Sequence, residues 1–512
     1  MNGSSRVGLG ISLVLSSLVA CSSPAPPPAA PKVVAAAPTS VPVKEAPVIK
    51  VRAGELVTYR GDKPLGRESY KDDGETLESD VSFVGQKATI RIVRSKKHVH
   101  IEGAGGAIES DIGPNTLALE NGHWAAYAIA AEQFAGATEP VPVKVLLPAE
   151  NVTLEGTISV KPTDAGGKRV AITLRGLTVT VDLDAQGNVV HAAVPAQNLE
   201  VRRASDPAPA LVVREAPASV TREAVQVMNG PVEIRGELWV PRDAHGKIPV
   251  ALLIAGSGPT DRDGNNTMGL RTDAYRMIAL GLAARGIATL RYDKRGVGES
   301  GTSFDPGQTV LGDFVEDAGL LQAKLEADPR FSTVSLVGHS EGGPIAVLLS
   351  QKAPPSSLVL LASPGRPLGE VLREQLASKL DAAGMKDVDR MLSAVRAGTS
   401  PEPVPEGLAL LFHQRVRAML KSEIDVDTAR ILHTLHVKTA IIQGEHDAQV
   451  SVADARALAK ARPDARLTLL PTMNHAFKEE ASIALPQASY TDPSKPLAPG
   501  LLDAIVAGIK AH

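Results

Sequence analysis

Cysteine, aromatic side chains and excess charge are all scarce in this chain of 512 residues. A single cysteine excludes any disulfide within the chain, and 43% hydrophobic residues are enough for a core without one. Aromatic residues make up only 3%, too few for a surface that stacks bases or sugars. The formal net charge is −3, so the chain has no excess of basic residues of the kind that binds nucleic acid or an anionic membrane surface. We therefore expect a globular protein of two or three domains with no nucleic-acid partner.

The position of the one cysteine is informative. Val7–Ala20 is mostly apolar, too short to span a bilayer but suited to the hydrophobic region of a signal peptide. Its end, Leu18–Cys21, resembles the bacterial lipobox, whose cysteine is lipidated and becomes the new N-terminus. Residues 1–21 thus predict a lipoprotein signal peptide, with Cys21 as the lipid anchor in the bacterial cell envelope. By resemblance to known sorting rules, Ser22 favours the outer membrane over the inner one. An ordinary cleaved signal with a chance cysteine is the alternative.

Composition and periodicity divide the next two hundred or so residues. Residues 22–50 are rich in proline and alanine, which predicts a semi-extended tether without a core. Residues 51–205 alternate apolar and polar side chains, as in Val170–Leu174, which predicts a mostly antiparallel β domain. Residues 206–217 are again rich in proline and alanine and predict a linker.

From residue 218 the pattern changes. Short, continuous apolar runs alternate with helical stretches such as Ala274–Arg285. This rhythm predicts an α/β fold with a doubly wound, mostly parallel sheet covered by helices on both faces. The apolar runs are Val250–Ile254, Ala288–Tyr292, Val334–Val337, Leu358–Ala362 and Ala440–Gln443.

One motif in this half carries chemistry. Gly338–Gly342 fits G-x-S-x-G, with a predicted buried strand directly before it and an apolar helix, Pro344–Gln351, directly after it. A strand-to-helix turn this sharp forces Ser340 into a strained backbone conformation and exposes its hydroxyl at the N-terminus of the helix. The glycines on either side let the chain segments approach without Cβ clashes. The context therefore predicts Ser340 as a nucleophile. The alternative is a glycine-rich turn without chemistry.

Over residues 220–512 the chain resembles the α/β-hydrolase family. The loop after the first predicted parallel strand matches the family loop that supplies one N–H to the oxyanion hole. This places that donor at Ser257, with Gly258 as the alternative, and the second donor at Glu341. Removing one such donor typically costs about 3–4 kcal/mol of transition-state stabilisation. Residues 292–300 resemble a further loop of the family, which we interpret as architectural.

The resemblance also supplies the partners of the nucleophile. Asp447 matches the family's acid after one late strand, with Glu445 as the alternative, and His475 follows the next strand at the position of the family's histidine. The chain order of Ser340, Asp447 and His475 is the order of this fold. His475 would accept the serine proton and return it to the leaving group, and Asp447 would orient the imidazole.

Residues 366–435 interrupt the alternation of strands and helices, and they match a helical lid that the family inserts over the nucleophile. The resemblance implies a serine hydrolase that cleaves small-molecule carboxylic esters through an acyl-enzyme on Ser340. One alternative is a serine aminopeptidase of the same fold, with lid carboxylates such as Glu370 or Glu374 facing a substrate ammonium group. Another is a non-catalytic envelope protein whose β domain binds a lipid or another protein.

No cofactor or metal is expected. Residues 261–265 begin like a calcium loop, but the glycine and glutamate that such a loop requires are replaced by Asn266 and Thr272. His98, His100 and Glu102 share one face of a predicted strand, which we interpret as an exposed polar face.

Overall fold

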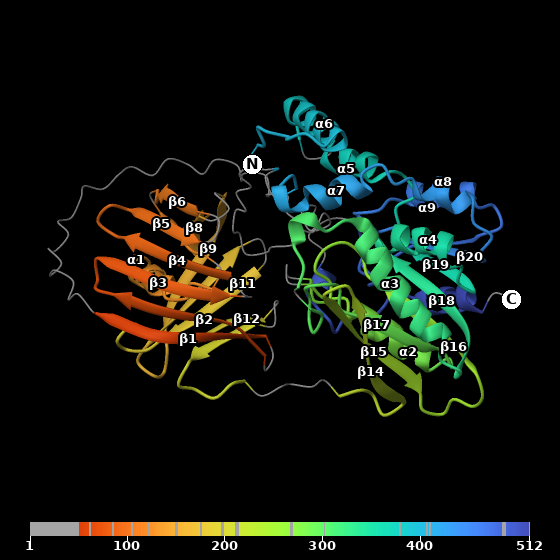
Figure 1. Cartoon of the computed structure of the whole chain (residues 1–512), viewed down its shortest axis with the longest axis horizontal. Coiled ribbons are helices and arrows are strands. Elements are labelled where there is room, and N and C mark those ends of the chain that lie inside the picture. The colour runs from red at the N-terminus through yellow and green to blue at the C-terminus, as the bar shows by residue number, and fades with distance from the viewer. Residues whose placement is uncertain are drawn as a thin grey trace. The chain divides into compact units, whose positions relative to one another are not determined.

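The computed structural model describes residues 51–510, apart from 61–62, 84–85, 104–105, 114, 121, 149–151, 175–176, 196–198, 210–214, 267–269, 302, 378–379, 406–407, 409–410 and 484–487. The predicted signal peptide, its Cys21 and the predicted tether lie outside these residues. The chain forms two compact units, the first within residues 51–209 and the second within residues 215–510 (Figure 1). Within the described range, no helix has the length and apolar character needed to cross a membrane.

The N-terminal unit is a single thirteen-stranded sheet in the order β6-β5-β4-β3-β2-β1-β13-β12-β11-β10-β9-β8-β7. Neighbouring strands are antiparallel except β7 and β8, so the predicted mostly antiparallel β domain is confirmed. The strands are β1 (Arg52–Arg60), β2 (Lys63–Asp72), β3 (Thr76–Phe83), β4 (Gln86–Val93), β5 (His98–Gly103), β6 (Gly106–Asp111), β7 (Thr116–Ala118), β8 (Val141–Leu147), β9 (Val152–Pro162), β10 (Lys168–Leu174), β11 (Leu177–Leu183), β12 (Val189–Val194) and β13 (Leu199–Arg203).

One helix, α1 (Ala126–Gln133), completes the core of this unit. Val170 and Ile172 of β10 are fully buried, as the alternating pattern requires, and they share one hydrophobic cluster with the alanines of α1. The buried carboxylate of Glu68 accepts hydrogen bonds from the backbone N–H groups of Trp124 (2.7 Å) and Ala125 (3.3 Å), just before α1. Burial raises the pKa of Glu68 to about 7.

The C-terminal unit contains an eight-stranded sheet in the order β14-β15-β17-β16-β18-β19-β20-β21. The strands β14 and β15 form an antiparallel hairpin, β15 pairs antiparallel with β17, and all other neighbours are parallel. The predicted mostly parallel sheet is confirmed. The strands are β14 (Val220–Asn229), β15 (Val232–Pro241), β16 (Ile248–Ile254), β17 (Ala288–Tyr292), β18 (Phe331–His339), β19 (Ser357–Leu361), β20 (Thr439–Gly444) and β21 (Arg466–Leu470).

Helices cover both faces of this sheet, as its continuous apolar strands require. In β16, Val250 and Leu252 pack in one cluster with α3 (Leu311–Glu326), α4 (Gly342–Lys352) and α9 (Val452–Ala461). The alternate residues Ala251 and Leu253 pack in a second cluster with α2 (Ala274–Ala283) and α10 (Leu501–Ile509). Two short 3-10 helices, η4 (Pro306–Gln308) and η7 (Ala488–Tyr490), lie in connecting loops.

The predicted lid region is helical. It contains α5 (Leu368–Ala377), α6 (Ala382–Ala397), the 3-10 turn η6 (Gln414–Val416), α7 (Arg417–Glu423) and α8 (Thr428–His433). Helices α5, α6 and α7 share a hydrophobic cluster of their own, in which Val388, Met391 and Phe412 are fully buried. Leu432 of α8 packs instead in a hydrophobic cluster of the eight-stranded sheet. We call α5 to α7 the cap.

Candidate active site

The nucleophile elbow has the backbone that its motif predicts. Ser340 lies between the end of β18 and the start of α4 with φ 52°, a left-handed conformation that is costly for a residue with a Cβ. A Cβ on Gly338 would lie 2.3 Å from the carbonyl oxygen of Gly342, and one on Gly342 would lie 2.2 Å from that of Ile254. Only glycine fits at either position, so the turn presents Ser340 at the first turn of α4.

Asp447 and His475 form the second part of the site. Nδ1 of His475 donates to Oδ2 of Asp447 at 2.8 Å, and both side chains are buried. Oδ1 of Asp447 accepts the backbone N–H groups of Gln449 (2.8 Å) and Val450 (2.9 Å), and Oδ2 also accepts from Nε2 of Gln443 (3.1 Å). Four donors therefore fix the direction of the carboxylate. Glu445, the alternative acid, is exposed.

A hydrogen-bonded chain links the nucleophile segment to the histidine loop. Nε2 of His339 lies 3.0 Å from the backbone oxygen of His475, which can only accept, so this nitrogen carries the proton. Nδ1 of His339 then accepts from the hydroxyl of Tyr275 at 2.7 Å, and that hydroxyl accepts the N–H of Gly256 at 3.3 Å. Burial lowers the pKa of His339 well below its usual value, which matches a neutral ring. The chain thus connects Ser340 and His475 through the residue before the serine.

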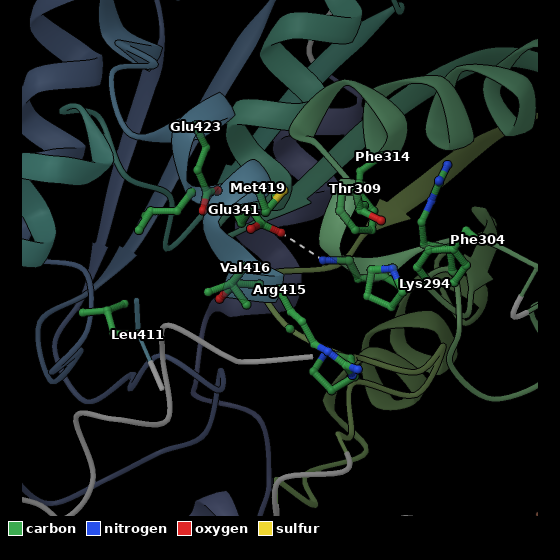
Figure 2. Close-up of a pocket in the computed structure, with 16 residues that line it drawn as sticks. Lys294, Phe304, Thr309, Phe314, Glu341, Leu411, Arg415, Val416, Met419 and Glu423 are labelled. Carbon is green, nitrogen blue, oxygen red and sulfur yellow. Dashed lines mark hydrogen bonds and ion pairs between the residues drawn. The ribbon is translucent and has the colours of Figure 1, made fainter. Parts of the chain in front are cut away.

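A buried charged cluster lies beside Glu341. Nζ of Lys294 donates to Oε2 of Glu341 at 2.9 Å (Figure 2). It also donates to the backbone oxygen of Gly256 at 3.0 Å. Glu423, the last residue of α7 in the cap, adds a second carboxyl group close to Glu341. Burial and the neighbouring Glu341 raise the pKa of Glu423 well above its usual value. Oε1 of Glu423 has no hydrogen-bond partner among the described residues, and a buried carboxyl group without donors favours its uncharged form.

Two pockets meet at this cluster, and Ser257, Glu341 and Glu423 line both of them. The pocket that contains Ser340 is mostly apolar, and its walls come from the cap and the sheet: Leu311, Pro344, Pro364, Leu368, Val371, Leu372, Val426 and Val450. The second pocket, drawn in Figure 2, is walled by Phe304, Phe314, Leu411, Val416, Met419 and Leu420. Neither pocket is lined by Glu370 or Glu374, which are exposed on α5.

Comparison with known proteins agrees with this architecture. Residues 268–392 match a family described as "Serine aminopeptidase, S33". Esterase EstD of Thermotoga maritima is 28% identical over 244 residues, which cover 47% of this chain and 57% of EstD. The C-terminal unit has the α/β-hydrolase fold. The family match and the esterase relative together mark this α/β-hydrolase unit as a hydrolase. The chain spans little more than half the length of EstD, so the activity of the whole protein is taken up below as a proposal.

Solved structures give further matches to part of this chain. Est1E from Butyrivibrio proteoclasticus, bound to ferulic acid, is 15% identical and has a TM-score of 0.36; the match covers 56% of this chain and 97% of Est1E. A hydrolase from Pseudomonas aeruginosa is 22% identical, with a TM-score of 0.33 and coverage of 49% of this chain and 91% of that one.

Several side chains at the site have no motif of their own. Lys294 lies in the loop that the sequence marks as architectural, and only the fold brings it to Glu341. Gln443 and Tyr275 act on Asp447 and on the nucleophile segment from elsewhere in the sequence. The cap carboxyl group that reaches the site is Glu423, not the exposed Glu370 or Glu374.

Proposed function

We propose that this chain is a serine hydrolase that cleaves carboxylic esters through an acyl-enzyme on Ser340. The observation that carries the proposal is the position of Ser340: a strained elbow at the start of a helix, on the wall of a mostly apolar pocket. An apolar pocket suits the acyl chain of an ester, and strain at one serine indicates a functional constraint.

The proposed reaction starts at Ser340 and uses His475 as the base and Asp447 as its partner. The Ser340 hydroxyl attacks the ester carbonyl while Nε2 of His475 takes its proton, and Asp447 stabilises the imidazolium through Nδ1. The N–H groups of Ser257 and Glu341 would bind the oxygen that becomes negative. The imidazolium then protonates the leaving alcohol. Water activated by His475 releases the acid and restores the serine.

The charge of the pockets favours an ester over a peptide with a free amino terminus. The carboxylates that an aminopeptidase would direct at a substrate ammonium, Glu370 and Glu374, are exposed outside both pockets. Inside, Lys294 neutralises Glu341. Because burial and the neighbouring Glu341 favour the uncharged form of Glu423, the cluster has little negative charge to attract a cation.

The test is hydrolysis of p-nitrophenyl acetate and butyrate by the protein and by Ser340→Ala. We expect turnover in the parent that falls by several orders of magnitude in the variant, and loss of labelling by a fluorophosphonate probe. Ser332→Ala is the matched control, since Ser332 is an exposed serine of β18, the strand that leads to Ser340. Equal, negligible rates in parent and variant, with turnover of aminoacyl-amides, would favour the peptidase. An unlabelled Ser340 in an inactive protein would favour the binding function.

We also propose that Cys21 anchors the enzyme in the cell envelope by a lipid, with the outer membrane as the expected site. The support is the sequence Leu18–Cys21 after an apolar stretch. After expression in a bacterial host, a two-phase detergent extraction should recover the protein in the detergent phase. Cys21→Ser should move the protein to the aqueous phase. If the parent and the variant partition between the two phases in the same way, the lipid anchor is contradicted.

A further inference from the structure

Lys294 is a buried lysine whose ammonium group contacts two different loops of the active site. Its side chain is 4% exposed, and it is the second residue after β17. Two of its protons go to Gly256 and Glu341, and a third side of the ammonium lies 4.3 Å above the ring of Phe314. We propose that Lys294 is a positioning residue for the oxyanion hole, whose one ammonium group orients the Ser257 amide and neutralises the side chain of Glu341, the second donor residue. The inference rests on the proposed ester hydrolysis.

The first contact orients the Ser257 donor. The carbonyl of Gly256 and the N–H of Ser257 belong to one planar peptide group, and in a trans peptide they point in opposite directions. Fixing the carbonyl oxygen at 3.0 Å from Nζ of Lys294 therefore fixes the direction of the Ser257 N–H. This peptide adjoins the nucleophile, because a Cβ on Gly256 would lie 3.0 Å from Cβ of Ser340. A cation on the carbonyl also polarises the peptide and strengthens its N–H as a donor.

The second contact acts at the Glu341 donor. The Glu341 N–H lies at the N-terminus of α4, where backbone N–H groups have no partner within the helix. Its own carboxylate, however, brings negative charge next to the place where the oxyanion forms. Lys294 neutralises that carboxylate at 2.9 Å. The cluster therefore keeps the carboxylate from repelling the transition state.

Stability alone explains this arrangement poorly. Burying an ammonium and a carboxylate costs several kcal/mol of desolvation for each ion, which their attraction repays only in good geometry, and well-packed apolar residues often do as well. An apolar pair could not hold the carbonyl of Gly256, whose peptide group carries the Ser257 N–H, together with the carboxylate of Glu341. The geometry points to positioning as the role of Lys294.

The first test compares Lys294→Met with the parent on p-nitrophenyl butyrate. We expect kcat to fall by about 10²-fold, as when one oxyanion donor is lost, with KM little changed. The affinity for an alkylboronic acid, which forms a tetrahedral adduct on the serine, should fall by a similar factor. The affinity for butyrate, a ground-state product, should stay constant. Lys352→Met removes an exposed lysine of α4 and is the control for loss of charge.

A second variant separates positioning from a general loss of structure. Lys294→Ala should lose kcat in the same way and regain part of it with added propylammonium, because Lys294 lines an open pocket that admits a small amine. Propanol, which lacks the charge, should not restore it. Restoration by both, or a fall in boronic-acid and butyrate affinity together, would overturn the inference.

The outcome for Ser340→Ala keeps this inference distinct from the proposed function. If that variant hydrolyses the ester as fast as the parent, ester hydrolysis through Ser340 fails, whatever Lys294 does. If it is inactive while Lys294→Met matches the parent in kcat and boronic-acid affinity, only the role of Lys294 fails.

Discussion

Replacing Asp447 by asparagine tests how the acid controls the histidine. Asp447 accepts four hydrogen bonds, two on each oxygen. In Asp447→Asn the amide oxygen would keep the two backbone donors of Gln449 and Val450. The amide nitrogen would then face Nδ1 of His475 and Nε2 of Gln443. Because an NH₂ group can only donate, the imidazole would have to turn Nδ1 into an acceptor and place its proton on Nε2.

A histidine in that tautomer cannot accept the proton of Ser340. In serine proteases the same exchange lowers kcat about 10⁴-fold, which corresponds to roughly 5–6 kcal/mol of activation free energy. We expect a loss of that order for Asp447→Asn in steady-state hydrolysis of p-nitrophenyl butyrate, with KM nearly unchanged. Glu445→Gln, a change at the exposed alternative acid, should stay within about twofold of the parent. A large loss in Glu445→Gln with a small one in Asp447→Asn would refute the assignment.

Three further predictions concern other parts of the molecule. Gly342→Ala would bring a Cβ within 2.2 Å of the carbonyl oxygen of Ile254, so we expect little folded protein and a much lower Tm. Tyr275→Phe removes the hydroxyl between Gly256 and His339, so kcat should fall about tenfold at constant KM, since one buried hydrogen bond to each neighbour is lost. Burial raises the folded-state pKa of Glu68 from 4.5 to about 7, so the folded state holds this proton more tightly and stability is lost as pH rises from about 4.5 to 7. Glu68→Gln should flatten that part of the Tm-versus-pH curve, and an unchanged curve would contradict the assignment.

The sequence predicts the parts of the α/β-hydrolase unit that depend on neighbouring residues in the chain. Ser340 lies in a local motif whose glycines are required by contacts of 2.2–2.3 Å, so its pattern is visible without the fold. Asp447 and His475 each follow a predicted strand, and the carboxyl ends of parallel strands meet at one edge of a sheet. The alternating pattern of the N-terminal unit likewise predicts its antiparallel strands.

Features that depend on long side chains or distant partners were not predictable in this way. Lys294 contacts Glu341, which is 47 residues further along the chain, and no pattern in its loop predicts which residue the ammonium group contacts. Helical spacing in the cap predicts helices but not which carboxyl group faces the pocket, so Glu423 was missed. The helix α1 consists largely of alanines, which carry no amphipathic pattern.

The most direct test of the account is the covalent intermediate itself. The protein is mixed with p-nitrophenyl butyrate, quenched with acid during turnover, digested and analysed by mass spectrometry. The account predicts one butyryl group on the peptide that contains Ser340, and none in Ser340→Ala. A butyryl group on another residue, or ester turnover that persists in Ser340→Ala, would contradict it.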